Sequence, residues 1–467
     1  MAEFDLAVIG AGAAGLSVTA VAAQLGLRVA LIERDRMGGD CLNVGCVPSK
    51  ALLAASHAAT AARGAGRFGV RLGDPVIDWA AVQAHVHGAI ATLEPADSET
   101  RFRGLGASVL RGEARFAAPD ALLVDGRRIT ARRIVIAAGS RAAVPPIPGL
   151  DAVPFLTNAS LFDLPERPEH LLILGGGPIG LEMADAFAGL GVRVTLVEAA
   201  HIAGKEDPEL VAGLRSALAG RGVVLLENAR VAAVEAGPTL VLADGRRVAG
   251  SHLLVAVGRR PNLEALDLEA GGVRASPAGV VTDRGLRSPS NRRVFAVGDI
   301  ADPAGIGPRA FTHVGSYHAG IVIRRALFRL PARVDYAALP RVTYTRPELA
   351  QVGLTEAEAA GRGVAVLRWN LAENDRAVAE GDTAGLVKLV VARGRVIGAG
   401  ILAPGAGEMI GLWALAIASR TPVSRLAGLV LPYPTHSEAG KRAAGTAYEP
   451  RLFAPMTRRV VGWLQRL

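Results

Sequence analysis

The sequence predicts an α/β protein that has two Rossmann-like domains and a C-terminal α+β domain. The first observation is that an apolar run, a GxGxxG motif and a helical pattern occur twice, from Asp5 and from His170. The second is that the matching glycines of the two copies lie 165 residues apart (175 − 10) without a slip. The third is that strand and helix patterns without a glycine motif follow residue 336. A chain of 467 residues is also too long for one hydrophobic core, so several domains are expected.

The two glycine motifs predict two dinucleotide sites. In each copy an apolar strand precedes the glycines, a helix follows them, and an acid ends the next strand. The glycines let the backbone approach a pyrophosphate, the helix N-terminus attracts its charge, and the acid accepts hydrogen bonds from ribose hydroxyls. The alternative is a pair of βαβ units that bind nothing. The candidate residues are Gly10, Gly12, Gly15 and Glu33 in the first copy, and Gly175, Gly177, Gly180 and Glu198 in the second.

The acid of the second copy also predicts the cofactor. A 2′-phosphate would meet the like charge of Glu198, so NADH is favoured over NADPH. No arginine follows, although His201 and Lys205 could help to bind a phosphate, which leaves NADPH possible.

The duplication continues downstream and defines the predicted domains. Residues 122–140 match residues 240–258, and a third apolar strand in SNRRVFAVGDIAD ends at Asp299. We expect this strand to return to the first domain, where Asp299 would accept from a hydroxylated cofactor chain; the alternative is a turn aspartate. The predicted domains are a first nucleotide-binding domain at 1–148 and 271–335, a second nucleotide-binding domain at 149–270, and a third domain without a nucleotide motif at 336–467. Strands are expected at 341–354 and 385–402, and helices at 407–420 and after Thr435.

Charge and composition exclude several classes of protein. The net charge of +9 could suit nucleic acid, an anionic membrane surface or phosphate-bearing cofactors. The arginines are scattered, so no nucleic-acid partner is expected. Residues 6–27 carry no charge and could be read as a membrane span, but turn-like glycines and Glu33 favour a buried strand, turn and helix. Glu3 and Asp5 have the wrong sign for a signal peptide, so a soluble cytoplasmic protein is expected.

The only two cysteines, Cys41 and Cys46, lie within CLNVGCVPSK. On a regular helix their Cα atoms would be about 8.6 Å apart, whereas a disulfide tolerates at most about 6.8 Å. Gly45 and Pro48 favour a distorted backbone that would allow a bridge, with a helix from near Pro48. Zinc would need two further ligands, for which His85-x-His87 is the best histidine spacing, and no metal site is expected. Two structural thiols remain an alternative to a redox dithiol.

GGDCLNVGCVPSK resembles the redox motif of the flavin-dependent pyridine nucleotide–disulfide oxidoreductases, the group of dihydrolipoamide dehydrogenase, glutathione reductase and mercuric reductase. The resemblance extends over nearly the whole chain, through GAGAAG, GGGPIG, VFAVGD, YTRPELAQVGLTEAEA and YPTHSE. It implies that Cys46 is the charge-transfer thiol beside the flavin and Cys41 the interchange thiol that meets substrate. It also implies that Lys50 lies by the flavin N5 and pairs with Glu182. It further implies that the domain at 1–148 and 271–335 binds FAD, that the domain at 149–270 binds NAD(P), and that the domain at 336–467 is the dimerisation domain. Further residues implied in cofactor binding are Ala114 and Gly139 for FAD, and Gly258 for NAD.

The resemblance implies electron flow from NAD(P)H through FAD to a Cys41–Cys46 disulfide, in a homodimer whose active site is completed by the partner's C-terminal segment. One departure bears on the acceptor, because the family's HPTxxE reads YPTHSE here. Tyr433 replaces the acid–base histidine, Glu438 is retained, and His436 is an alternative base. Mercuric reductases also carry tyrosine there, but the vicinal cysteine pair near their C-terminus and their N-terminal metal-binding domain are not expected in this chain.

The expected function is therefore mercuric-reductase-like, with a small disulfide, a metal ion or another small molecule as acceptor. One alternative is a disulfide reductase of the dihydrolipoamide dehydrogenase type. The other is electron transfer at a membrane surface, because RRVVGWLQRL places Val460, Leu464 and Leu467 on one helical face with Trp463 beside them. A tail packed on the dimer would explain the same pattern.

Overall fold

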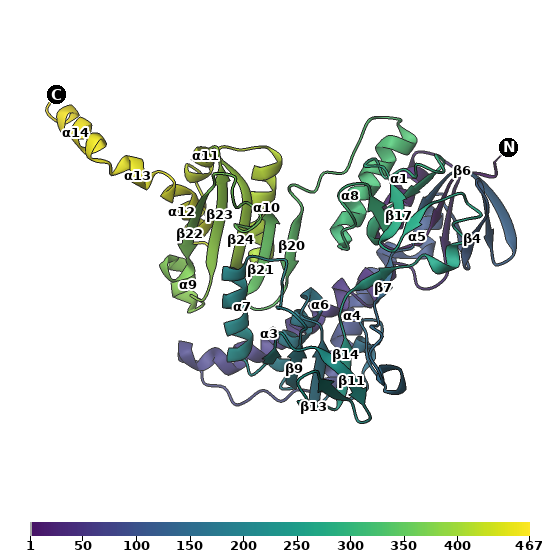
Figure 1. Ribbon diagram of the computed structural model, residues 1–467, viewed down its shortest axis with the longest axis horizontal. Coiled ribbons are helices and arrows are strands. Elements are labelled where there is room, and N and C mark those ends of the chain that lie inside the picture. The colour runs from purple at the N-terminus through teal and green to yellow at the C-terminus, as the bar shows by residue number, and fades with distance from the viewer. Residues whose placement is uncertain (1) are drawn as a thin grey trace. The chain divides into compact units, whose positions relative to one another are not determined.

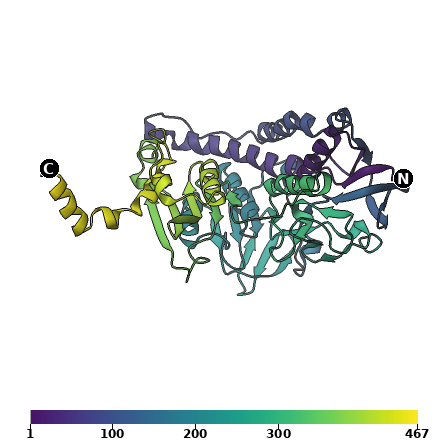
Figure 2. The same ribbon diagram turned by 90° about the horizontal axis from the view of Figure 1, so that it is seen from above.

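The computed structural model describes residues 2–467 and confirms the predicted mixed α/β class (Figures 1 and 2). The chain divides into two compact units. Unit 1 comprises the chain up to Ala55, Gly73–Pro168 and His252–Val334, and unit 2 comprises Ser56–Leu72, Glu169–Ser251 and Asp335–Leu467. Residues 169–251 of the predicted NAD(P)-binding domain thus lie in unit 2, and the boundaries given above for the four domain segments stay a prediction.

Unit 1 is built on a sheet with the strand order β3-β2-β1-β6-β5-β4. Its first strands are parallel, with Leu6 of β1 opposite Val29 of β2, and β1 is buried on both faces as central parallel strands are. Residues 6–27 thus form a strand, a turn and a helix, and no helix among residues 2–467 is long and apolar enough to span a bilayer. The bounds are β1 (Phe4–Ile9), α1 (Ala13–Gln24), β2 (Val29–Glu33), α4 (Trp79–Asp97), α5 (Glu99–Gly104), β3 (Ser108–Arg111), β4 (Ala114–Ala118), β5 (Ala121–Val124) and β6 (Arg127–Ile136).

The strand that ends in Asp299 returns to this sheet, as predicted. Val294 of β18 lies opposite Ile134 of β6 in parallel pairing. The helix that follows, α8, packs against α1. A two-stranded ribbon, β7 with β15, and a small sheet of β16, β17 and β19 complete the sheets of this region. The bounds are β7 (Ser140–Ala142), β14 (His252–Val255), β15 (Arg259–Pro261), β16 (Ala275–Ser276), β17 (Gly279–Thr282), β18 (Val294–Ala296), β19 (Ala301–Pro303) and α8 (Thr312–Val322).

Unit 2 repeats the parallel strand–helix pattern and adds an antiparallel sheet. The second copy pairs β8 with β9 and β9 with β10, all in parallel. Its bounds are β8 (His170–Leu174), α6 (Pro178–Gly189), β9 (Arg193–Val197), α7 (Pro208–Gly220), β10 (Val224–Leu226), β11 (Val231–Glu235), β12 (Thr239–Leu242) and β13 (Arg247–Ala249).

The C-terminal part is a five-stranded antiparallel sheet with the order β20-β21-β24-β23-β22, against which α10 packs (Figure 1). The expected strands and helices are present, and the structure adds β22, α9 and α11. The apolar and polar residues of AVLRWN do not alternate regularly and only Leu367 of β22 is buried, so the strand signal is weak. The bounds are β20 (Pro340–Thr343), β21 (Glu348–Gly353), β22 (Ala365–Asn370), α9 (Asp375–Glu380), β23 (Leu386–Ala392), β24 (Arg395–Ala403), α10 (Ala406–Ala418), α11 (Val423–Ala427), α12 (Glu438–Thr446), α13 (Glu449–Leu452) and α14 (Pro455–Leu464).

Candidate active site

The first glycine motif forms a turn that only glycine permits, between the end of β1 and the start of α1. Gly10 has φ 103°, and a Cβ there would lie 2.5 Å from the carbonyl oxygen of Ala137. A Cβ on Gly15 would lie 1.9 Å from the carbonyl oxygen of Gly10. The loop therefore packs backbone against backbone, which leaves no room for a side chain at either position.

We expect Gly15→Ala to weaken FAD retention and to lower the melting temperature, because its methyl group overlaps the Gly10 carbonyl. Gly88→Ala is the matched control: Gly88 lies inside α4, a methyl group there would have no atom within 4 Å, and alanine should stabilise the helix by about 0.5–1 kcal/mol. Flavin absorbance after gel filtration and thermal unfolding measure both effects. A Gly15→Ala protein with full flavin content and unchanged melting temperature would contradict this account of the loop.

Each of the two motif acids accepts hydrogen bonds from backbone amides of its own glycine loop and of the residues that follow the acid. Glu33 Oε2 accepts from the amide of Ala11 at 2.7 Å, and its Oε1 accepts from Asp35 at 2.8 Å. Glu198 repeats both bonds, with Gly176 at 2.7 Å and Ala200 at 2.9 Å. The sequence predicted a ribose acceptor but not these hydrogen bonds. A carboxylate offers about four acceptor sites, so each acid keeps capacity for ribose hydroxyls.

The helices after the motifs begin with amides that no side chain caps. Gly12 is the N-cap of α1, and Gly177 is the N-cap of α6; neither helix start has a side-chain cap hydrogen bond. A Cβ on Gly12 would come no closer than 3.8 Å to another atom, and Gly177 has open space around it. Uncapped amides with open space before them suit the phosphates of a dinucleotide. Both loops therefore fit a dinucleotide, and the assignment of FAD to the first motif and of a nicotinamide dinucleotide to the second stays a prediction.

Asp299 belongs to a polar network that the sequence only partly revealed. Ser140 Oγ donates to Asp299 Oδ2 at 2.6 Å, and Arg259 Nε lies 3.6 Å from the same oxygen. Burial raises the pKa of Asp299. Arg259 also donates to the Ser140 carbonyl at 2.8 Å and to the carboxylate of Asp40, the residue before Cys41. The network thus joins the predicted cofactor acid to the neighbour of a cysteine. The VGRRPN motif could have pointed to Arg259, but nothing in the sequence singled out Ser140.

His318 supports the turn that carries Asp299. The amide of Gly298 donates to His318 Nδ1 at 3.1 Å. Burial lowers the pKa of His318 to about 4, so its ring is neutral and can accept this bond above pH 5. Sequence reasoning missed this residue, because a histidine in a largely apolar helix carries no recognisable pattern.

The backbone between the two cysteines is interrupted. Helix α2 (Gly39–Asn43) ends before Gly45, and helix α3 (Cys46–Gly64) begins at the second cysteine. A Cβ on Gly45 would lie 2.8 Å from the Asp40 carbonyl oxygen, so the turn requires glycine. The prediction that the pair does not share a regular helix is confirmed, although α3 begins two residues before Pro48. No disulfide joins Cys41 and Cys46 in this structure, and the Cys41–Cys46 bridge stays a prediction.

The two thiols have unequal surroundings. A hydrogen bond to Cys46, together with burial, raises the pKa of the Cys41 thiol far above its usual range. Cys46 Sγ lies 3.1 Å from Thr312 Oγ1, at the start of α8, and Cys46 is the first residue of a 19-residue helix. Helix N-termini stabilise thiolates. The arrangement favours a negative charge on Cys46 and a proton on Cys41. No sequence pattern pointed to Thr312.

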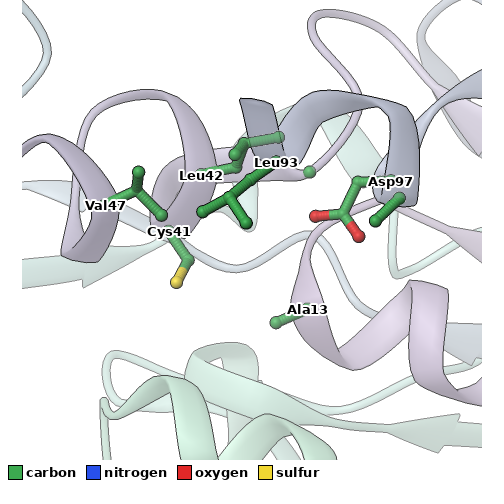
Figure 3. A pocket seen from close by; sticks show the side chains of 8 residues that line it. Ala13, Cys41, Leu42, Val47, Leu93 and Asp97 are labelled. Carbon is green, nitrogen blue, oxygen red and sulfur yellow. The ribbon is translucent and has the colours of Figure 1, made fainter. Parts of the chain in front are cut away.

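A cavity of about 190 Å³ lies beside Cys41 in unit 1 (Figure 3). Its wall is mostly apolar, and burial raises the pKa of Asp97, its one carboxylate. The lining residues come from the start of α1, from the cysteine segment and from α4. They are Ala13, Gly38, Cys41, Leu42, Val47, Leu93, Ala96 and Asp97. The cavity therefore adjoins both the predicted cofactor loop at Ala13 and the cysteine segment.

Two other predicted residues lie in different units. Lys50 is half-buried on α3 in unit 1, and its Nζ donates to Ser49 Oγ at 3.4 Å. Glu182 is buried on α6 in unit 2, where its Oε1 accepts from the amide of Tyr344 at 3.0 Å. The predicted pairing of Lys50 with Glu182 stays a prediction.

The remaining cofactor candidates lie on strands or at their ends. Gly139 and Gly258 flank the β7–β15 ribbon, where the Gly139 carbonyl accepts from Asn262 at 3.1 Å and the Gly258 carbonyl from Ala143 at 2.9 Å. Ala114 is buried at the start of β4, opposite Val124. The predicted roles of Ala114 and Gly139 with FAD, and of Gly258 with NAD, stay predictions.

The YPTHSE segment has a partner that the sequence did not reveal. The hydroxyl of Tyr433, whose residue is 68% exposed, donates to Asp375 Oδ2 at 2.7 Å. This hydrogen bond raises the pKa of Tyr433 above its usual value. His436 Nε2 lies 3.4 Å from Glu380. Glu438 starts α12 and lines a polar cavity of about 250 Å³, whose wall is Trp369, Glu373, Asn374, Asp375, Glu438 and Arg442.

Comparison with known proteins places the chain in a family. The family model for pyridine nucleotide-disulphide oxidoreductases matches residues 4–357, and the model for the dimerisation domain of that family matches residues 339–444. The mercuric reductase of Streptomyces lividans is 39% identical over 460 residues, which cover 95% of this chain and 96% of the relative. The dihydrolipoyl dehydrogenase of Geobacillus stearothermophilus is 34% identical over 462 residues, again 95% and 96% of the two chains.

A solved structure agrees with these relatives. The Cu(II) complex of the HOCl-induced flavoprotein disulfide reductase RclA from Escherichia coli matches 96% of this chain and 100% of its own, with a TM-score of 0.86 and 27% identity. The predicted family is confirmed, with its cofactors FAD and NAD(P)H, and the dimerisation domain supports a homodimer. The chain is therefore an FAD-dependent NAD(P)H oxidoreductase of the pyridine nucleotide-disulphide oxidoreductase family.

Proposed function

We propose that the protein uses NAD(P)H to reduce a thiophilic metal ion at the Cys41–Cys46 pair, in the manner that the name of its mercuric reductase relatives suggests. The single observation that carries this choice of acceptor is the hydrogen bond from Tyr433 to Asp375. Tyr433 occupies the position at which disulfide reductases of the family carry a histidine. The side chain that Asp375 binds there is therefore a phenol rather than an imidazole.

The chain's own residues would hold the cofactors at the two glycine loops. Gly10, Gly12 and Gly15 with Glu33 would bind FAD, and Asp299 would accept from its hydroxylated chain. The second loop, with Glu198, would bind the nicotinamide dinucleotide. When bound, FAD takes a hydride from NAD(P)H and makes two electrons available. We also propose that the domain boundaries lie at residues 148, 270 and 335, as the sequence predicts.

The cysteine pair would store and release those two electrons. Reduction of the Cys41–Cys46 disulfide consumes one NAD(P)H and one proton and gives two thiols and NAD(P)⁺. A soft ion such as Hg(II), bound between the sulfurs, would then take both electrons and become the zero-valent metal, while the S–S bond re-forms and two protons leave. With Cu(II), two ions would each take one electron and become Cu(I) for each S–S bond that re-forms. Cys46 would bind the ion first, because its position at the start of α3 and beside Thr312 stabilises the thiolate.

Tyr433 favours a metal ion over an organic disulfide for a physical reason. Thiol–disulfide exchange releases a thiolate that a nearby acid must protonate, and imidazole has a suitable pKa near neutrality. The pKa of Tyr433 is raised, so its hydroxyl keeps its proton at neutral pH. A soft metal ion binds thiolate sulfur directly and needs no acid. In the homodimer, we propose, Tyr433 and Glu438 of one subunit complete the site of the other.

An acceptor screen tests the proposal. The purified dimer would oxidise NADH in the presence of Hg(II), Cu(II), lipoamide, glutathione disulfide or a soluble quinone, each with and without an excess of a competing small thiol. We expect Hg(II) or Cu(II) to support the fastest NADH oxidation and to depend on Cys46. Faster turnover with lipoamide or glutathione disulfide would instead assign the protein to the disulfide reductases.

The cofactor preference is expected to follow Glu198. We expect kcat/KM for NADH to exceed that for NADPH by about tenfold or more, because the carboxylate repels a 2′-phosphate. Glu198→Gln keeps an oxygen that can accept from the Gly176 amide but removes the negative charge. It should therefore lower the ratio of kcat/KM for NADH to kcat/KM for NADPH. Steady-state rates with both nucleotides measure the effect. Glu33→Gln, in the first motif, is the matched control and should leave the NADH/NADPH ratio unchanged.

A further inference from the structure

The end of the chain forms a helix with an unpaired apolar face. Helix α14 (Pro455–Leu464) has no buried residue. Trp463 is 61% exposed and Leu467, just beyond the helix, is 88% exposed. The helix is held to α13 by a hydrogen bond from Thr457 Oγ1 to the Arg451 carbonyl at 2.7 Å (Figure 2, yellow). It lies beyond residue 444, where the match to the family's dimerisation domain ends.

The apolar residues of this segment fall on one side of the helix. Met456, Val460, Trp463, Leu464 and Leu467 follow the spacing i, i+4, i+7, i+8 and i+11, and all five are exposed. Such spacing brings side chains to one face, because each residue turns the helix by about 100°. An exposed aromatic and aliphatic stripe of this kind requires a partner surface.

Charge identifies that partner. Residues 450–467 contain four arginines, Arg451, Arg458, Arg459 and Arg466, and no acidic residue. Arg459 and Arg466 flank the apolar stripe, where long basic side chains can reach lipid headgroups while the stripe enters the acyl boundary.

We propose that α14 docks the protein on an anionic lipid bilayer. A helix of this length binds weakly by itself, but each arginine adds attraction to anionic headgroups and the homodimer carries two copies. The apolar stripe would lie in the bilayer interface parallel to its plane, with Trp463 at headgroup level.

The neighbouring residues Val460 and Val461 provide a matched test. They are the same residue type with nearly equal exposure, 47% and 48%. Val460 belongs to the stripe, whereas Val461 lies about 100° further around the helix and outside the stripe. Val460→Asp and Val461→Asp therefore change the charge equally and differ only in the face that they alter.

The experiment is co-sedimentation of the full-length FAD-loaded dimer with vesicles of equal parts phosphatidylcholine and phosphatidylglycerol, at low and high salt. We expect the wild type to bind, Val461→Asp to bind slightly less because of its added charge, and Val460→Asp to need about tenfold more lipid than Val461→Asp. Binding should fall at high salt and be absent on pure phosphatidylcholine.

Three results would overturn the proposal. One is an absence of wild-type binding, and the second is an equal loss in both variants, which would indicate charge attraction without the stripe. The third is a change of dimer mass in Val460→Asp by light scattering, which would make the stripe a subunit contact. Reduction of dissolved acceptors by NADH should be the same in all three proteins, so failure here is distinguishable from failure of the proposed catalytic function.

Discussion

Cys46→Ser is expected to abolish NADH-dependent reduction of Hg(II) and of disulfides, with a loss of about 10³-fold or more. A serine hydroxyl can neither form the S–S bond nor bind a soft ion as a thiolate does. Rates of NADH oxidation with each acceptor measure the loss. NADH oxidation by ferricyanide, which takes electrons from bound FAD without the cysteines, is the control and should stay near the wild-type rate.

The same variant should change the reactivity of Cys41. The hydrogen bond that the Cys41 thiol donates to Cys46 contributes most to raising the pKa of Cys41, so removing the Cys46 sulfur should bring that pKa back toward its ordinary value. A raised pKa keeps the thiol protonated as pH rises, and a lowered one exposes thiolate earlier. Iodoacetamide should therefore modify Cys41 faster in Cys46→Ser than in the reduced wild type between pH 7 and 9. Retained metal reduction, or slower alkylation, would contradict the assigned roles.

Tyr433→His is expected to create disulfide reductase activity, raising kcat/KM for lipoamide or glutathione disulfide by about 10²- to 10⁴-fold. An imidazole at this position would supply the acid that protonates the leaving thiolate, with Asp375 or Glu438 available to orient it. Steady-state assays with both disulfides measure the gain. Tyr433→Phe is the control, because it removes the hydroxyl without adding an acid, and it should gain nothing.

The pH dependence of disulfide reduction shows whether the gain in Tyr433→His comes from proton transfer by the imidazole or from the altered size of the side chain. In the wild type the pKa of Tyr433 lies above its ordinary value of about 10, so its hydroxyl stays protonated and causes no inflection between pH 6 and 9. The histidine variant should show a new inflection near pH 6.5, the ordinary imidazole value. Equal gains in the histidine and phenylalanine variants, or no new inflection, would show that position 433 does not control proton transfer.

The fold was largely predictable because its main signals are local. Glycine motifs, apolar runs and the acid at each strand end are short patterns, and they placed both parallel sheets and the returning strand correctly. The strand Ala365–Asn370 was not predicted, because it is six residues long and its apolar and polar residues do not alternate regularly. Patterns that short compete poorly with loop sequences.

The site was predictable only where family motifs carry it. Thr312 beside Cys46, Ser140 beside Asp299 and Asp375 beside Tyr433 come from distant parts of the chain and from residue types common in loops. Such contacts depend on tertiary packing, which no single-sequence pattern records. The departure of Tyr433 from the family motif could be read from the sequence, but its carboxylate partner could not.

The paired bonds of Glu198 have a consequence for anyone who would redesign the nucleotide preference. The residue that senses the 2′ position also fastens the loop that holds the pyrophosphate, through the Gly176 and Ala200 amides. Substituting a basic side chain to admit NADPH would loosen the loop in the same step. A successful redesign must therefore supply a replacement acceptor for those amides, and the intact first copy around Glu33 provides the geometry to imitate.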